Sequence, residues 1–282
     1  MSVTTDDAWT LRGDRRGDGP VVAVLGHAMM VDRRTMDRPA GQGLASELAA
    51  RGIEVLSFDA RGHGQSGPGA DIGGSWTYDD IVRRDVPAMI AAGREVAAGR
   101  RVVLVGHSLI GHAALIHAGL DPRRTADGIV ALAPNLWAPH LERSAARRAL
   151  KAASLRSWLA VTRAKGFFDT KGLGLGNTAE ARAYVEQFWT MWRTDRLASP
   201  DGVVDYEDAL GEARVSVLGV SSDGDRLFAH PDSVDAYLGL MTAADVEHRR
   251  LRGPDAPDHM GLVTSSRSHA LWSEVADWIL AG

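Results

Sequence analysis

A serine follows a short apolar run near residue 105, in a setting that could make its hydroxyl a nucleophile. The run Val102–Gly106 is apolar and rich in β-branched residues, as in a fully buried strand, and Ser108 follows it closely. Residues 109–116 then have the pattern of a helix that packs on this strand. Free backbone N–H groups at the start of a helix stabilise negative charge that develops nearby. Ser108 is therefore the first candidate for chemistry.

Apolar runs alternate with helical patterns along most of the chain. We expect strands at 9–12, 21–25, 53–58, 102–106, 128–133, 215–220 and 246–251. We expect helices between them, at 39–51, 79–97, 109–116, 231–241 and 262–280. This alternation predicts an α/β fold with a mostly parallel central sheet and helices on both faces. Such sheets bind ligands beyond the carboxyl ends of their strands, where His27, Ser108 and Asn135 fall.

The alternation breaks between residues 135 and 205. This stretch is helical in pattern, without a clear strand, and it holds four of the eight tryptophans and three of the five phenylalanines. We interpret 135–205 as a helical cap inserted into a core formed by 1–134 and 206–282. Its aromatic side chains either pack the cap onto the core or line an apolar pocket above Ser108. The candidate pocket residues are His27, Met30, Trp137, Trp189 and Trp192.

The composition is that of an ordinary globular protein, with 45% hydrophobic and 24% charged residues among 282. The net charge of −4 gives no reason to expect nucleic acid or a membrane surface as a partner. The absence of cysteine excludes disulfides, thiolate metal sites and cysteine nucleophiles. The polar start of the chain differs from a signal peptide, and no stretch approaches the roughly 18 apolar residues of a membrane span. A cytoplasmic location is the default expectation.

Five segments, taken in order, resemble those of the α/β-hydrolases. They are Gly26-His27-Ala28-Met29, the turn Asp59-x-Arg61-Gly62-x-Gly64-x-Ser66, the Gly-x-Ser turn at Ser108, the loop at Asp225 and the loop at His259. The chain is therefore identified as similar to the serine-hydrolase branch of that superfamily. The Met-Met pair, the GHSL sequence and the Trp-x-x-Trp pair of the cap further resemble an uncharacterised bacterial group of predicted α/β-hydrolases. That closer resemblance implies no substrate.

The resemblance implies a catalytic triad. A serine hydroxyl needs a histidine that removes its proton, and the histidine needs a carboxylate that fixes its tautomer. Ser108 would be the nucleophile, and His259, in the loop after the last strand, would be the base. Asp225 is the preferred acid and Asp223 the alternative, since both follow the same strand. Asn135 offers no carboxylate at the other acid position known in relatives.

The resemblance also implies an oxyanion hole made by the backbone N–H groups of Leu109 and Met29. Ala28 replaces the usual glycine there, a change that backbone donors tolerate. His27 is expected to brace this loop rather than transfer protons. The turn at 59–66 is expected to order the loop beneath the site.

One position departs from the family pattern. Ile110 stands where the family usually has glycine or another small residue, and Gly111 comes one residue late. A side chain branched at Cβ is expected to crowd the neighbouring strand or the catalytic histidine.

Together these residues predict a serine hydrolase without a cofactor or a metal. It would cleave an ester, thioester or lactone of a small-molecule acyl substrate through an acyl-enzyme. The alternatives are acyl transfer, a lyase or cyclase reaction in the same pocket, and a non-catalytic ligand-binding protein. Dehalogenases and epoxide hydrolases of this fold are disfavoured, because they carry aspartate in place of Ser108. A homodimer is left open.

Overall fold

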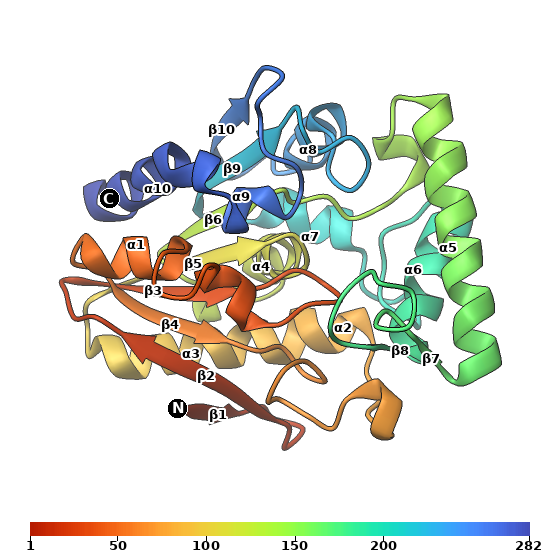
Figure 1. Cartoon of the computed structure of the whole chain (residues 1–282), viewed down its shortest axis with the longest axis horizontal. Coiled ribbons are helices and arrows are strands. Elements are labelled where there is room, and N and C mark those ends of the chain that lie inside the picture. Colours follow the sequence, from red (N-terminus) through yellow and green to blue (C-terminus); the bar gives the residue numbers. More distant parts are fainter.

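An eight-stranded sheet runs through the molecule (Figure 1), and the computed structural model describes the whole chain, residues 1–282. The strand order is β1-β2-β4-β3-β5-β6-β9-β10. Neighbours from β4 to β10 pair in parallel, whereas β2 is antiparallel to both β1 and β4. The strands are β1 (Ser2–Thr4), β2 (Thr10–Arg16), β3 (Val21–Gly26), β4 (Glu54–Phe58), β5 (Arg101–His107), β6 (Gly128–Leu132), β9 (Ser216–Ser222) and β10 (Asp245–Leu251). The expected mostly parallel sheet is confirmed.

Helices cover both faces of this sheet (Figure 1). On one face, α1 (Leu44–Ala50) packs against α10 (His269–Ala281), and on the other α3 (Val86–Ala97) packs against α4 (Leu109–Leu120). Because both faces are covered, β3, β4 and β6 are buried along their whole length. This explains why their sequences are continuous apolar runs rather than alternating ones.

The segment between β6 and β9 lies mostly beyond the end of the sheet (Figure 1). It contains the helices α5 (Ala145–Lys165) and α6 (Arg182–Thr194), which pack against each other. The next helix, α7 (Tyr206–Glu212), lies instead against α4 of the core. This is the region for which the sequence predicts a helical cap, and we keep that name for residues 135–205. No helix combines the length and apolar character that crossing a membrane requires.

Expectations for the cap and for three helices differ from the structure. The cap contains a short antiparallel pair, β7 (Phe167–Phe168) with β8 (Glu180–Ala181), although the sequence shows no strand there. The helix expected at 39–51 begins only at Leu44, because the Asp37 side chain accepts the N–H groups of Gly41 and Gly43 and holds a turn before it.

Two long helical patterns are also interrupted. The pattern at 79–97 consists of α2 (Tyr78–Asp80), five residues of π-helix (Ile81–Asp85) and α3. The pattern at 262–280 consists of α9 (Gly261–Thr264), a 3-10 turn and α10. The Ser268 hydroxyl donates to the carbonyl of Gly261 across this last break. Side-chain bonds of this kind compete with helical ones and are invisible to hydrophobic periodicity. The remaining helix, α8 (Pro231–Leu238), packs on β9 and β10.

Candidate active site

Ser108 lies on a strained turn between β5 and α4. Its φ of 48° and ψ of −104° are costly for a residue with a Cβ. The Ser108 N–H donates to the carbonyl of Leu132 in β6 at 2.8 Å, and its carbonyl accepts the N–H of His112 at 2.9 Å. These bonds hold the turn between strand and helix. The half-buried Ser108 side chain therefore stands at the carboxyl end of the sheet.

Glycines let α4 approach the sheet this closely. A Cβ on Gly106 would overlap the backbone of Gly111, and one on Gly111 would lie 2.7 Å from the Gly106 carbonyl oxygen. Ile110 is fully buried and fills the space over Gly26 of β3, where any Cβ would clash with it. The Ile110 side chain thus crowds the neighbouring strand only at Gly26, which has no side chain to clash with it. Ile110 packs on β3 and leaves the Ser108 turn intact.

The structure brings Asp225 to His259. Oδ2 of Asp225 is 2.5 Å from Nδ1 of His259. Burial raises the pKa of Asp225, but His259, the Ala229 backbone and His107 together outweigh burial, so the net shift of that pKa is downward. A carboxylate at Nδ1 holds the ring proton there and leaves Nε2 as the acceptor. Asp223 instead binds the Arg250 side chain at 2.7 Å and does not approach His259.

The His259 loop is braced from two sides. Nε2 of His107 is 3.0 Å from the carbonyl oxygen of His259. The Phe228 ring lies 5.1 Å from the His259 ring, centroid to centroid. Asn135 and Trp137 donate side-chain N–H groups to the Phe228 carbonyl at 2.7 and 2.8 Å.

No hydrogen bond joins Ser108 to His259 in this structure, although both side chains are partly exposed at the same end of the sheet. In enzymes of this type such a bond often tightens only when the substrate is bound. The structure therefore places the three expected residues at the carboxyl end of the sheet and joins Asp225 to His259 by a hydrogen bond.

The two backbone N–H groups expected to form the oxyanion hole donate no hydrogen bond within the protein. Leu109 is the first residue of α4, so its N–H has no intrahelical partner. Met29 lies in the loop after β3, and its N–H also has no partner within the protein. The Ile110 N–H donates to the His27 carbonyl at 3.4 Å, which joins this loop to the first turn of α4. The N–H groups of Leu109 and Met29 are thus both available to bind an oxyanion.

His27 does not line a pocket. Its ring is completely buried, Nε2 accepts the N–H of Ala60 at 3.0 Å, and Nδ1 lies 2.7 Å from the Ala28 carbonyl. Burial and the neighbouring His63 lower the pKa of His27 to about 4, so the ring is neutral. His27 is therefore a brace for the loop that carries Met29.

Of the other candidate pocket residues, only Trp137 lies near the Asp225–His259 pair. Trp137 contacts the Phe228 ring beside His259 and stacks on Trp158 at 5.6 Å, which links the cap to the Asp225–His259 pair. Trp192 is buried in α6, and Trp189 lies under the Arg156 guanidinium at 5.4 Å. Neither of these two contacts the residues of the pair. Met30 is buried and held by cap residues, as described below.

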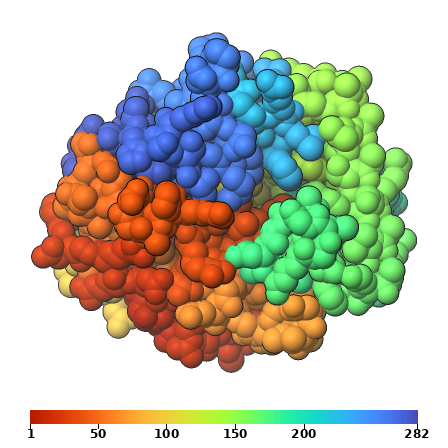
Figure 2. Space-filling view, in the orientation of Figure 1, coloured from red at the N-terminus to blue at the C-terminus, as the bar shows by residue number.

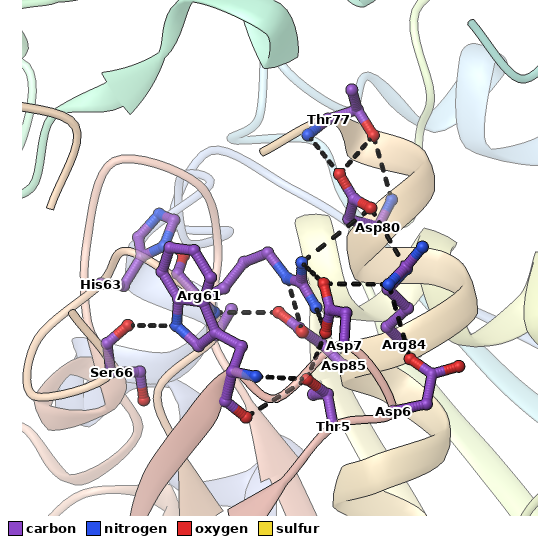
Figure 3. Close-up of polar contacts among 12 residues, drawn as sticks. Thr5, Asp6, Asp7, Arg61, His63, Ser66, Thr77, Asp80, Arg84 and Asp85 are labelled. Carbon is purple, nitrogen blue, oxygen red and sulfur yellow. Dashed lines mark hydrogen bonds and ion pairs between the residues drawn. The ribbon is translucent and has the colours of Figure 1, made fainter. Parts of the chain in front are cut away.

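The turn at 59–66 is fixed by a network of charged groups (Figure 3). Arg61 binds buried Asp85 at 2.7 Å and Asp7 at 2.9 Å. The Trp9 indole donates to the carbonyl of Ser66 at 2.7 Å. His63 belongs to the same turn, although it occupies a variable position of the sequence motif and carries no signal there. Among the residues described, no group of three or more histidine or acidic side chains is arranged to hold a metal ion.

Comparisons with known proteins agree with this architecture. Residues 40–168 match the family model of the S33 serine aminopeptidases, which are α/β-hydrolases. Two solved structures follow nearly the whole chain: an esterase of Pyrococcus furiosus, with a TM-score of 0.65, and the enol-lactonase of Burkholderia xenovorans, with a TM-score of 0.62. The chain has the α/β-hydrolase fold.

These similarities differ in identity and in the share of each chain that they cover. The esterase is 18% identical over 100% of this chain and 89% of its own, and the lactonase 17% identical over 100% of both. At these identities the likeness shows the fold alone. Triacylglycerol lipase 2 of Arabidopsis thaliana is 30% identical in an alignment 161 residues long, which covers 49% of this chain. The chain spans only 38% of the length of that lipase.

Proposed function

We propose that this protein is a serine hydrolase that cleaves a carboxylic ester, thioester or lactone through an acyl-enzyme. The observation that carries the proposal is the 2.5 Å contact between buried Asp225 and His259. It lies at the carboxyl end of the sheet, where the strained Ser108 turn is also found. A fixed carboxylate, a histidine with a free nitrogen and a partly exposed serine are the parts that acyl transfer needs.

The proposed reaction has two halves. Nε2 of His259 removes the proton of the Ser108 hydroxyl while the oxygen attacks the acyl carbon. The Leu109 and Met29 N–H groups bind the oxyanion that forms, and Asp225 stabilises the positive charge on His259. His259 then gives the proton to the leaving alcohol or thiol, and the acyl group stays on Ser108. Water, activated by His259, releases the acid and restores the serine.

Two further observations support this class of substrate. The aromatic rings of Phe228 and Trp137 form an apolar wall beside His259, which suits an apolar acyl or alcohol group. The proteins that resemble this chain are named lipase, esterase and enol-lactonase, and those names denote ester or lactone bonds.

The first test is intact mass after incubation with a fluorophosphonate, which reacts with activated serines. We expect one adduct on the wild type and none on Ser108→Ala or His259→Ala. Ester, thioester and lactone panels then define the leaving group and the acyl chain. A folded wild type without an adduct would contradict the proposal and favour a ligand-binding protein with a hydrolase fold.

A further inference from the structure

A glutamate of the cap reaches into the core beside the candidate oxyanion hole. Glu180 of β8 is completely buried, and its Oε1 accepts the N–H of Met30 at 2.6 Å. The same oxygen lies 3.1 Å from Nε2 of His63, which is also completely buried. Met30 directly follows Met29, the proposed oxyanion donor. Glu180 thus joins three segments that are distant in sequence.

The ring of His63 lies between two acceptors. Nε2 faces the Glu180 carboxylate, and Nδ1 is 2.8 Å from the carbonyl oxygen of Arg61. A neutral imidazole has one N–H and can satisfy only one of them, whereas an imidazolium donates to both. Burial lowers the pKa of His63, but Glu180, the Arg61 carbonyl and Asp59 together raise it, and the net shift is upward. With an acceptor at each ring nitrogen, His63 is placed to pair with Glu180 as a buried imidazolium.

The cap also holds Met30 by its carbonyl. The N–H groups of Asn177 and Thr178 donate to the Met30 oxygen at 2.9 and 3.1 Å. Gly176 packs so closely on Met30 that a Cβ would overlap its carbonyl. In Figure 2 this green segment of the cap lies directly on the orange-red region near residue 30. Met30 itself has a φ of 65°, a left-handed conformation that a non-glycine residue keeps only when its surroundings impose it.

These contacts fix the peptide that links Met29 to Met30, while His27 fixes the start of the same loop. We propose that Glu180 and His63 are positioning residues that couple the cap to the oxyanion hole. By binding the Met30 N–H, the pair holds the Met29 N–H in the direction of Ser108. Neither residue contacts the reacting atoms, so both act through Met29. This inference rests on the proposed function.

A positioning role has a distinct kinetic signature. A misplaced oxyanion donor weakens binding of the transition state and leaves binding of the ester almost unchanged. Removing a whole donor costs about 10²- to 10³-fold in kcat, so a displaced one should cost about 10- to 100-fold. KM should change little. Glu180→Ala removes both the acceptor for Met30 and the charge that holds His63, whereas Glu180→Gln keeps an acceptor and loses only the charge.

Gln187 of α6 offers a matched control. It is buried in the same cap, and its side-chain oxygen accepts the N–H of Asp79 in α2 at 3.2 Å. Its Nε2 donates to the Ala198 carbonyl and the Tyr206 hydroxyl. Gln187→Ala therefore loosens a cap–core contact that does not involve the oxyanion loop.

The experiment combines amide hydrogen exchange of the peptide that spans 26–31 with steady-state kinetics on an ester from the panel, for wild type, Glu180→Ala, Glu180→Gln and Gln187→Ala. We expect Glu180→Ala to speed exchange in that peptide and to lower kcat about 10- to 100-fold at similar KM. Glu180→Gln should be intermediate, and Gln187→Ala should resemble the wild type in both measurements. If Glu180→Ala does not fold, the nearly isosteric Glu180→Gln carries the test.

The inference is overturned if exchange or kcat in the Glu180 variants stays at the wild-type level. It is also overturned if Gln187→Ala loses as much kcat as Glu180→Ala, because the effect would then be general loosening of the cap. A wild type that hydrolyses no ester would overturn the proposed function instead. The exchange of peptide 26–31 would then decide by itself whether Glu180 holds the loop.

Discussion

Two carboxylate–histidine pairs with buried carboxylates differ in what the second ring nitrogen does. Asp225 binds Nδ1 of His259, and Nε2 of that ring has no hydrogen-bond partner. Glu180 lies at Nε2 of His63, and Nδ1 of that ring faces the Arg61 carbonyl. A histidine can exchange protons with a substrate only through a nitrogen that is free. The first pair is suited to chemistry, and the second is suited to holding the cap on the core.

The largest expected effect concerns the Asp225–His259 pair. Asp225→Asn should lower kcat about 10⁴-fold, because an amide no longer holds the His259 proton on Nδ1. Asp223→Asn is the matched control, since Asp223 lies two residues away and binds Arg250. It should leave kcat unchanged. Steady-state kinetics on one ester compares the two variants, and equal losses in both would contradict the assignment of Asp225.

The second pair should matter more for stability. His63→Phe leaves Glu180 buried without its cation, and removing one partner of a buried pair costs about 3–5 kcal/mol. Urea unfolding at neutral pH measures this loss. The control His269→Phe changes an exposed histidine of α10 and should have little effect. A small loss in both variants would show that the His63 ring is not charged in the folded protein.

Unfolding measured over a pH series tests whether His63 is charged in the folded protein. Folding raises the pKa of His63, so the ion pair stabilises the fold fully below the unfolded histidine pKa of about 6.5 and ceases to do so as the pH rises through the folded value. We expect the difference in unfolding free energy between wild type and His63→Phe to shrink as the pH is raised from about 6 to about 9. The groups that face His63 are Glu180, Asp59 and the neutral His27, and all three are present in both proteins. A constant difference across the series would contradict the charge assignment.

The smallest effect concerns the turn beside the first pair. Ile110→Val removes one methyl group from a fully buried side chain and should cost about 1 kcal/mol of stability. Because Ile110 packs on Gly26 and not on His259, kcat and the preference among acyl chains should not change. Denaturant unfolding and the ester panel check both statements. A broadened acyl preference would show that Ile110 forms part of the pocket.

The sequence predicts the inner strands of the sheet well, because β3, β4 and β6 are buried on both faces and consist of continuous apolar runs. The sequence does not predict the exposed strand β1, which has no such run, or the two-residue strands β7 and β8. It also misses the breaks near Asp37 and Ser268, where side chains bind the backbone. Periodicity records burial and does not record such bonds.

The sequence likewise predicts some residues of the candidate site and misses others. Ser108, Asp225 and His259 could be selected because each follows a strand in the order of a known family, and the structure pairs two of them. Glu180 could not be selected, since its partners Met30 and His63 lie 150 and 117 residues away in the chain. Its position in the cap carries no apolar pattern that would mark it. Only the packing of the cap on the core reveals its role.

The packing of Ile110 over Gly26 has a consequence for engineering. The two positions share one volume, so neither can be exchanged without regard to the other. Grafting the Ser108 turn of this protein into a relative that carries a side chain at the position of Gly26 should yield a misfolded hybrid. Transplanting both positions together should yield a working one. Any recombination library built from this scaffold should therefore keep β3 and the start of α4 within a single inherited block.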